Sequence, residues 1–494
     1  MSGGTDDYKN YSLSGNLSKD IALFKNIFKR DAVFRIREVL IGASAAKCCL
    51  FYMDGMVNSS QLGETVVEAL IECRLYENSV PSAEDIAQNI LFANEVTETE
   101  KIPDMLRAIL YGDTVLIVQK SRSALCINTK GWRTRGITEP DSERVLQGPR
   151  EGFDEAAMLN LAMIRRKLLT PDLCIEMTRI GRRSDTPVFI CYLGGLAEQK
   201  TVDTLKSRLK KIDIDGILDS NYIAENIKDN KYGILKTIGT TERPDVVAAR
   251  LLEGRIAVVT DGTPSVLTLP YLFSENFQSD EDYYVNFTLA SVSRLLRYIC
   301  FFLAVSVPGV FLALITHHFA LLPTHFAITV SRLREGVPIS SFAECLSLLF
   351  AFEILKESGL RMPQNLGHAL SVVGGLVVGE AAVGAGVISA PMLIAVALSA
   401  IAGLMVPSLS GAVFYLRLIN VLACALFGLY GFFAVSSLFV LKVFNMSSFG
   451  TDYTVSFSNP NRQNLKDVFV RASWSNMLTR PLFSKNRIRK GTSK

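Results

Sequence analysis

The spacing of hydrophobic and polar positions along the chain changes near residue 297. Before it, apolar runs of strand length alternate with stretches of helical periodicity, as in AKCCLFYM (46–53) followed by QLGETVVEALIECR (61–74). Beyond it, apolar runs reach the length of about 20 residues that a helix needs to cross a bilayer. The pattern predicts a multi-span α-helical membrane bundle preceded by a soluble α/β region of two modules.

The soluble region divides at a segment rich in residues that break helices and strands, RTRGITEPDSERVLQGPREGF (133–153). Strand candidates and helices alternate on both sides of it, which is typical of layered α/β structure. We therefore predict an N-terminal polar or helical segment, a first α/β module, a connector, a second α/β module, a transmembrane domain and a basic tail. Their respective ranges are 1–32, 33–138, 139–152, 150–290, 291–442 and 443–494.

Four segments of the transmembrane domain are predicted to span the membrane as helices, because hydrocarbon offers no partner to open backbone groups. They are 298–315, 366–387, 390–408 and 418–441. Two other segments are ambiguous. Residues 320–331 are too short to cross alone, and 341–357 carry Glu344 and Glu353 on opposite faces of a helix. Each is a re-entrant, interfacial or cavity-lining element, or else a helix buried among the spans.

The distribution of charge predicts how the chain is oriented. Residues 442–494 contain ten Lys and Arg against two Asp and Glu, which places this tail in the cytoplasm by the positive-inside rule. Arg294 and Arg297 favour the same side for the soluble region, and the polar N-terminus has no secretory signal. Four crossings satisfy the even number that both ends require. The basic tail is also suited to contact anionic membrane lipids.

Motifs of the common catalytic and nucleotide-binding sites are missing from the sequence. It has no G-x-S-x-G, no H-E-x-x-H and no G-x-x-x-x-G-K-[ST]. Its nine cysteines form no C-x-x-C pair, and no Cys, Asp or Glu accompanies His317, His318 and His325. We therefore expect a protein that is not an enzyme, with reduced cysteines, no cofactor, no metal and no nucleic-acid partner.

A glycine-rich run carries the one formal charge between Arg361 and Arg417, which is Glu380. Such a carboxylate is costly in lipid and usually faces a bundle interior or an aqueous path. We propose it as the first candidate for an ion path, with Ser371 and Ser389 on the same segment; Glu344 and Glu353 are the next candidates. A structural role, in which Glu380 pairs with Arg361 or Arg417 or caps a broken helix, stays open. Gly375 and Gly379 have the small-x-x-x-small spacing of close helix packing.

Several longer motifs resemble one family. They are RTRGITEPDSERVLQGPREGF (133–153), DNKYGILKTIGTTERPD (229–245), GRIAVVTDGTPSVLTLP (254–270), SDEDYY (279–284), LLPTHFAITVSRLREGVP (321–338), ILKESGLRMP (354–363) and VGGLVVGEAAVGAGVIS (373–389). In this order they are similar to the A subunits of GerA-type spore germinant receptors, together with the related stage V sporulation protein AF. The similarity covers about 130 to 450 and does not separate the two.

The resemblance implies a multi-pass subunit of a nutrient-sensing complex in the spore inner membrane. Its implied partners are a transporter-like B subunit that binds the nutrient and a lipoprotein C subunit. It also implies self-association into a ring that conducts cations when the nutrient is sensed. A non-conducting scaffold or assembly subunit is the alternative, and so is an AF-type protein acting with ion or dipicolinate release. Cation flux through liposomes would distinguish a channel from a scaffold.

Overall fold

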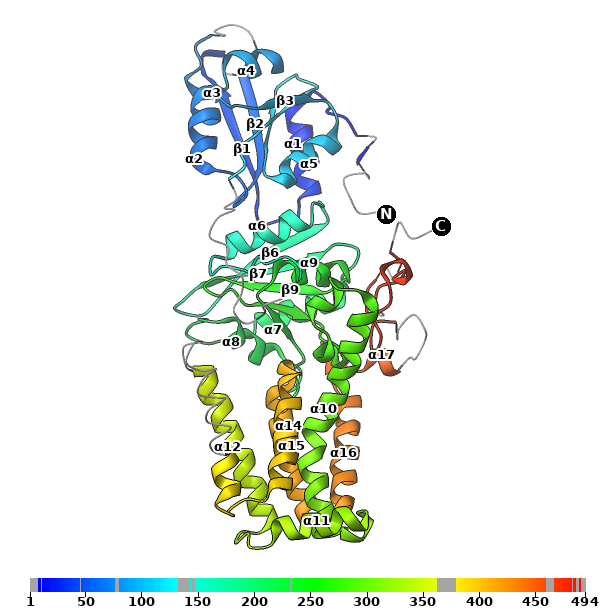
Figure 1. Cartoon of the computed structure of the whole chain (residues 1–494). Coiled ribbons are helices and arrows are strands. Elements are labelled where there is room, and N and C mark those ends of the chain that lie inside the picture. The colour runs from blue at the N-terminus through cyan, green and yellow to red at the C-terminus, as the bar shows by residue number, and fades with distance from the viewer. Residues whose placement is uncertain are drawn as a thin grey trace.

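A computed structural model describes residues 8–9, 11–44, 46–75, 80–131, 143, 147–231, 233–361, 379–458, 466–481, 483–485 and 488–489. Two α/β modules are stacked end to end above a bundle of helices, and the C-terminal tail lies beside the lower module (Figure 1). The predicted fold class is confirmed in that an α/β region precedes a helical region with apolar helices.

The first module is a five-stranded antiparallel sheet flanked by helices, with strand order β1-β2-β4-β5-β3. Its helix α1 packs Phe24 against Phe51 of β2, so this helix belongs to the module rather than to a separate N-terminal segment. The elements are α1 (Leu17–Ile27), β1 (Phe34–Ile41), β2 (Ala46–Met53), α2 (Ser59–Gln61), the π-helix η3 (Leu62–Glu68), α3 (Ala69–Glu72), α4 (Ala83–Asn89), β3 (Val96–Thr99), α5 (Ile102–Tyr111), β4 (Thr114–Val118) and β5 (Ala124–Ile127).

The second module repeats this plan, with strand order β6-β7-β9-β10-β8. Its elements are α6 (Ala157–Lys167), β6 (Leu173–Ile180), β7 (Thr186–Leu193), α7 (Gln199–Leu209), α8 (Ser220–Ile227), β8 (Gly239–Thr241), α9 (Pro244–Leu252), β9 (Ile256–Thr260) and β10 (Val266–Leu269). Two short 3₁₀ helices, η4 (Phe273–Phe277) and η5 (Asp280–Tyr283), then lead into the bundle.

The two modules match in strand register as well as in order, so they are an internal repeat. Thr114 pairs with Ile127 between β4 and β5, and Ile256 pairs with Leu269 between β9 and β10, each 142 positions later. Gly112 and Gly254, also 142 positions apart, both adopt positive φ before the strand that follows. We call residues 17–127 the first repeat and 157–269 the second repeat.

One continuous core joins the two repeats. Helix α6 of the second repeat packs against α5 of the first, and both contribute to a single buried cluster. Arg165 on α6 forms an ion pair with Asp31, and both side chains are almost completely buried. The backbone also crosses the junction, because Ala32 N–H donates to Ile175 O at 2.8 Å and Ile175 N–H to Arg30 O at 2.9 Å.

The bundle begins with α10 (Phe287–Thr316). Its 30 residues correspond to a length of about 45 Å, which exceeds the roughly 30 Å thickness of bilayer hydrocarbon. Its first turns lie beside the second repeat, and its end reaches the far side of the bundle (Figure 1). The other elements are η6 (Phe319–Leu321), α11 (Thr324–Arg334), α12 (Ser341–Arg361), α14 (Ala390–Leu404), η7 (Pro407–Leu409), α15 (Ser410–Phe427) and α16 (Leu429–Phe444).

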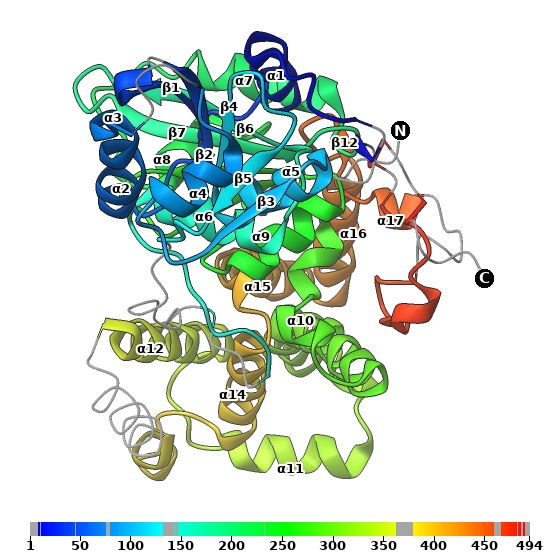
Figure 2. The same cartoon turned by 90° about the horizontal axis from the view of Figure 1, so that it is seen from above.

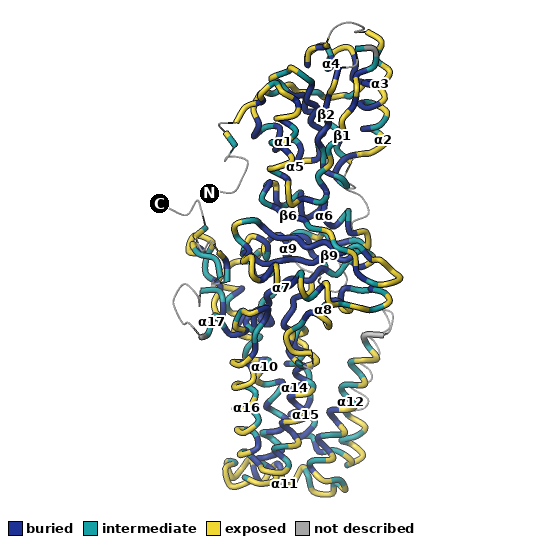
Figure 3. Tube along the Cα trace, turned by 180° about the vertical axis from the view of Figure 1, so that it is seen from behind, coloured by how far each residue is buried: buried dark blue, intermediate teal, exposed yellow. Residues whose placement is uncertain are grey.

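Two described helices are long and apolar enough to cross a membrane, Phe287–Thr316 and Pro407–Phe427, and two shorter apolar helices accompany them. Large apolar side chains on the outward faces are exposed, whereas the faces between helices are buried (Figure 3). Helix α11, in the ambiguous segment 320–331, crosses the far end of the bundle (Figure 2). Helix α12, from the other ambiguous segment, runs along the bundle from that end toward the second repeat (Figure 1). The expected span at 366–387 lies mostly outside the described residues.

The expected single helix over 418–441 is wrong, because two helices occupy this region. The chain turns at Gly428, which has φ 59° and ψ −141°, a conformation that glycine adopts without the steric cost of a Cβ. The returning helix α16 lies so close to α15 that a Cβ on Gly431 would be 2.2 Å from Ala423 O. No charge marks this turn, and hydropathy therefore could not show it.

Candidate functional site

Inside the bundle, the buried Arg417 of α15 lies next to the point of α10 where Pro308 interrupts the helical hydrogen bonds. Pro308 lacks an N–H, so Ala304 O, four residues earlier, loses its helical partner. Ser399 Oγ–H and Arg417 Nε–H donate to this oxygen at 2.8 and 2.9 Å. Arg417 Nη2 also donates to Ser399 O at 3.1 Å. This arginine therefore fastens α10, α14 and α15 together. In the described part of the chain Arg417 donates to backbone carbonyls and Glu380 is exposed, so these two residues do not pair there.

Two of the predicted ion-path residues meet at the end of the bundle that lies away from the second repeat, where α12 begins next to α11. Glu344 on α12 is fully buried, and its Oε1 accepts hydrogen bonds from Ser389 N–H at 2.6 Å and Ser389 Oγ–H at 2.5 Å. Ser389 is the N-cap residue of α14, and the helix dipole favours a negative group at this end. Glu344 Oε2 is buried without a hydrogen-bond partner, and Arg334 Nη2 is 3.9 Å away. One carboxylate oxygen is therefore held by hydrogen bonds, and the other is buried within ion-pair distance of Arg334.

Of the other predicted ion-path residues, Glu380 and Glu353 are described and neither lies at this place. Glu380 is exposed on a helical segment that precedes Ser389, and neighbouring Gly379 faces Leu393 of α14. Glu353 forms an ion pair with Lys356 one turn along the same helix. Ser371 and Gly375, like the side chain of Arg361, lie outside the part of the chain that the structure describes.

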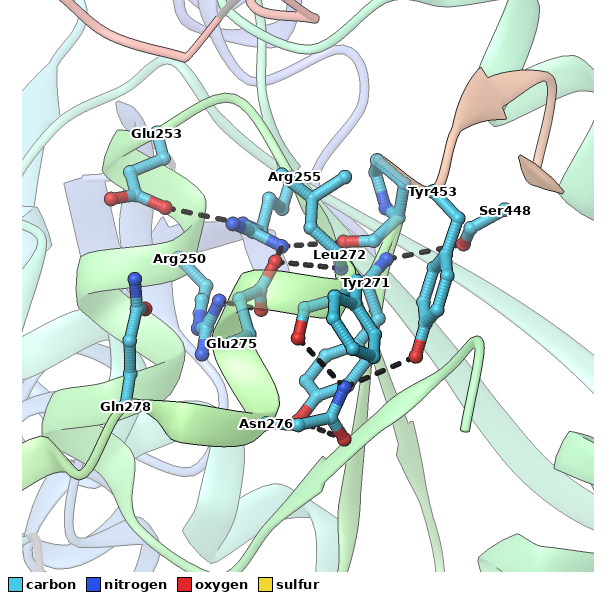
Figure 4. Close-up of polar contacts among 12 residues, drawn as sticks. Arg250, Glu253, Arg255, Tyr271, Leu272, Glu275, Asn276, Gln278, Ser448 and Tyr453 are labelled. Atoms are coloured by element: carbon cyan, nitrogen blue, oxygen red, sulfur yellow. Dashed lines mark hydrogen bonds and ion pairs between the residues drawn. The ribbon is translucent and has the colours of Figure 1, made fainter. Parts of the chain in front are cut away.

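A second polar cluster joins the second repeat to the bundle (Figure 4). Glu275 is buried and accepts hydrogen bonds from Arg250, from Arg255 Nη1 at 2.6 Å and from Leu272 N–H at 2.8 Å. Close by, Asn276 Nδ2 donates to Tyr453 Oη at 3.1 Å, which connects the chain leaving the second repeat with the chain that leaves α16. A carboxylate between two guanidinium groups fixes these segments without leaving a bare buried charge.

The first turns of α10 are held by a similar cluster. Asp282 on η5 accepts from Arg294 Nε at 3.2 Å and from Arg297 Nη2 at 2.8 Å. Asp467 of the tail accepts from Arg294 Nη1 at 2.8 Å and from Tyr283 Oη at 2.8 Å. Burial raises the pKa of Asp467, and the charge and hydrogen bonds of Arg294 oppose that rise. We call η4 and η5, which lie between the second repeat and α10, the elbow. Arg294 is fully buried, so the cluster fastens the elbow, α10 and the tail to one another.

Comparison with known proteins agrees with the order of the motifs. The model of the Bacillus/Clostridium GerA spore germination protein family matches residues 22–483. This chain belongs to the GerA family. It is 35% identical to spore germination protein KA of Bacillus subtilis (strain 168) over 94% of this chain and 85% of the relative. It is 31% identical to spore germination protein GerLA of Bacillus cereus over 95% and 96%.

One solved relative is the N-terminal domain of the A subunit of the Bacillus megaterium spore germinant receptor GerK3. The two are 33% identical, with a TM-score of 0.42 over 53% of this chain and 98% of that domain.

Three of the GerA motifs quoted from the sequence meet where the connector, the second repeat and the start of the bundle adjoin. Arg243, from the motif 229–245, is fully buried and donates to Asp245 Oδ2 at 2.8 Å and to Pro149 O at 2.9 Å. Tyr284, from SDEDYY, donates to the same carboxylate of Asp245. A Cβ on Gly148 would be 2.7 Å from the ring of Tyr284. Three motifs of this GerA chain therefore build one joint between connector, second repeat and bundle.

Two features of the site were missed in the sequence. Arg417 was read as a boundary of spans, although it is a buried ligand of backbone carbonyls. The tail was predicted only as a basic cytoplasmic segment suited to anionic lipids, and its contacts with α10 through Asp467 and Arg471 were not predicted. In the described part of the chain, no group of three or more His, Cys, Asp or Glu could hold a metal ion.

Proposed function

We propose that this GerA chain is the membrane subunit of a spore germinant receptor complex and starts germination in response to nutrients. Several copies form a ring that conducts cations, and a nutrient-binding B-type partner gates it. A lipoprotein C subunit completes the complex. The names of the relatives, which are spore germination proteins, support the role in germination. The channel reading rests on the residues of the bundle.

The observation that carries the channel reading is the buried carboxylate of Glu344. A charged group inside a bundle is expensive, and it persists where it serves a polar path or pairs completely. Here one oxygen is held by Ser389 at the start of α14 and the other has no hydrogen bond. Glu380 precedes Ser389 on the same segment and is exposed. In a ring of subunits, such carboxylates favour cations over anions.

The first test changes the charge of Glu380 in the assembled complex. In liposomes that contain the chain with its B-type and C-type partners, Glu380→Gln should change cation conductance or selectivity. Glu380→Lys should lower nutrient-triggered cation flux by about tenfold, because a ring of positive charge repels the ion. Flux is measured with an ion-sensitive dye, and assembly by co-purification of the three subunits.

The matched control is Glu353→Gln, since Glu353 has its own partner in Lys356 on the same helix. It removes one negative charge from the bundle and should leave conductance unchanged. Normal flux and selectivity in a correctly assembled Glu380→Gln complex would exclude Glu380 from the path. Absence of cation flux from the wild-type complex would favour the scaffold function.

We further propose that the soluble region and the tail both lie in the cytoplasm, with the bundle in the spore inner membrane. The start of α10 and the end of α16 both lie next to the second repeat, so the chain enters and leaves the bundle at one side (Figure 1). This supports one common side for the α/β region and the tail, whatever the number of crossings, and the basic tail assigns that side to the cytoplasm. Helix α11 then lies at the opposite surface.

Single cysteines test this orientation. Ser60 is exposed on the first repeat and Ser331 is exposed on α11. Eight of the native cysteines are buried, so the background needs only Cys73→Ser. A membrane-impermeant thiol reagent added outside intact cells should label Ser331→Cys and not Ser60→Cys, and permeabilised cells should show both labelled. Labelling of Ser60→Cys in intact cells would reverse the topology.

A further inference from the structure

The internal repeat shows that the C-terminal tail occupies a position that belongs to the fold. In the first repeat, Met56 O accepts a hydrogen bond at 2.9 Å from Gly131 N–H, which follows the last strand. The equivalent carbonyl of the second repeat, 140 positions later, is Leu196 O. It accepts a hydrogen bond at 3.0 Å from Lys485 N–H of the tail. The tail thus takes the place that the first repeat fills with its own following residues.

Further contacts fix this end of the tail to the second repeat. Arg480 Nε–H donates to Leu252 O at 2.8 Å, at the last residue of α9. The guanidinium group of Arg255 lies over the ring of Phe483 at 4.9 Å. Ser484 is buried, and its Oγ would be 2.9 Å from a Cβ on Gly254. This end is therefore packed and hydrogen-bonded rather than resting on the surface.

The other end of the described tail is fixed to α10. Arg471 N–H donates to Ser291 Oγ at 3.1 Å, and Arg471 Nη1 donates to Val285 O at 3.0 Å. Asp467 Oδ1 accepts from Arg294 as described above. Arg471 also lies over the rings of Tyr283 and Trp474. Two residues of the tail thus hold the elbow and the first three turns of α10.

Between these two attachments the tail does not pack continuously on the second repeat. A cavity of about 720 Å³ lies between the tail and the second repeat. It is lined on one side by residues of α9 and its C-cap, such as Ala249 and Glu253, and on the other by tail residues such as Val468 and Met477. A displacement of the second repeat therefore reaches α10 along the tail chain as well as through the elbow.

We propose that tail residues 466–481 and 483–485 form a strut, which holds the first turns of α10 in a fixed position relative to the second repeat. The strut is attached to the first turns of α10, which lie beside the second repeat and before the apolar part of this helix. A change in the second repeat is transmitted to the bundle through it. The consequence for gating rests on the proposed channel function; the mechanical coupling does not.

Hydrogen–deuterium exchange of the full-length protein in lipid nanodiscs tests the strut. Arg480→Ala removes the hydrogen bond from the tail to Leu252 O of α9, an attachment to the second repeat. If the strut transmits position, amides of residues 287–298 should exchange about tenfold faster in this variant. Asp467→Ala, at the opposite end, should have the same effect on α10. The strands of the second repeat should exchange at the wild-type rate in both.

The matched control is Asp213→Asn, which breaks the exposed Arg182–Asp213 pair of the second repeat far along the chain from the tail. It should leave α10 unchanged. If Arg480→Ala does not release the tail, a chain ending at Thr479 removes this attachment entirely. Faster exchange in residues 466–479 together with unchanged exchange in 287–298 would overturn the strut. Nutrient-triggered flux is measured separately, so loss of coupling and absence of a channel give different results.

Discussion

Asp31→Ala should lower the free energy of unfolding of the soluble region by about 3–5 kcal/mol. The substitution leaves the guanidinium group of Arg165 buried without its carboxylate, at a point where both repeats share one core. The cost of that bare charge exceeds the loss of the pair itself. It should be measured in the full-length protein from hydrogen exchange of the slowest amides of β2 and β7.

The control for Asp31 is Asp54→Ala, which removes the exposed pair between Arg35 and Asp54. Exposed pairs contribute less than about 1 kcal/mol. The double variant Asp31→Leu with Arg165→Met should recover much of the loss, because an apolar pair needs no compensating charge. A cost below about 1 kcal/mol for Asp31→Ala would show that the ion pair does not hold the repeats together.

Arg417→Leu should destabilise the bundle by about 3 kcal/mol or more, from two hydrogen bonds of a charged donor at about 1.5 kcal/mol each. Ala304 O and Ser399 O, both in buried residues, would lose their arginine donor. The midpoint of thermal unfolding in detergent, followed by thiol exposure of the buried Cys345 and Cys424, measures the effect.

A double-mutant cycle with Pro308→Ala decides whether the proline is the reason for the arginine. Alanine restores the N–H that takes Ala304 O within the helix, so Arg417→Leu should cost less in this background. Equal costs in both backgrounds would mean that the proline is not the reason for the arginine. Arg417→Lys should recover only part of the stability, because one ammonium group cannot reproduce the fixed fork of donors.

The buried carboxylate and the tail have different importance for the proposed channel. Glu344 lies within the bundle and meets Ser389, 45 residues further along the chain. Asp467 and Arg471 act outside the bundle, on the part of α10 next to the second repeat. If a partner moves the soluble region, the movement would reach α10 through Asp467 and Arg471. It would then act on the proposed ion path at Glu344.

Much of the architecture was determined by the sequence alone. The scarcity of charge after Arg297 predicts a membrane bundle, because transfer of charge and open backbone into hydrocarbon is unfavourable wherever it occurs. The strand–helix alternation before it predicts two α/β modules, since periodicity depends on local geometry. Glu344 and Ser389 were selected as polar groups in apolar surroundings, and the motifs identified the family.

Only the tertiary structure decided which residues meet. The repeat is defined by strand register, and the sequences of its halves diverge except at positions such as Gly112 and Gly254. The turn at Gly428 is invisible to hydropathy, because it lies in an unbroken apolar run. The pairing of Glu344 with Ser389, the binding of Arg417 to backbone carbonyls and the docking of the tail join segments far apart in the chain. Such contacts depend on how whole elements pack, which no local pattern of residues specifies.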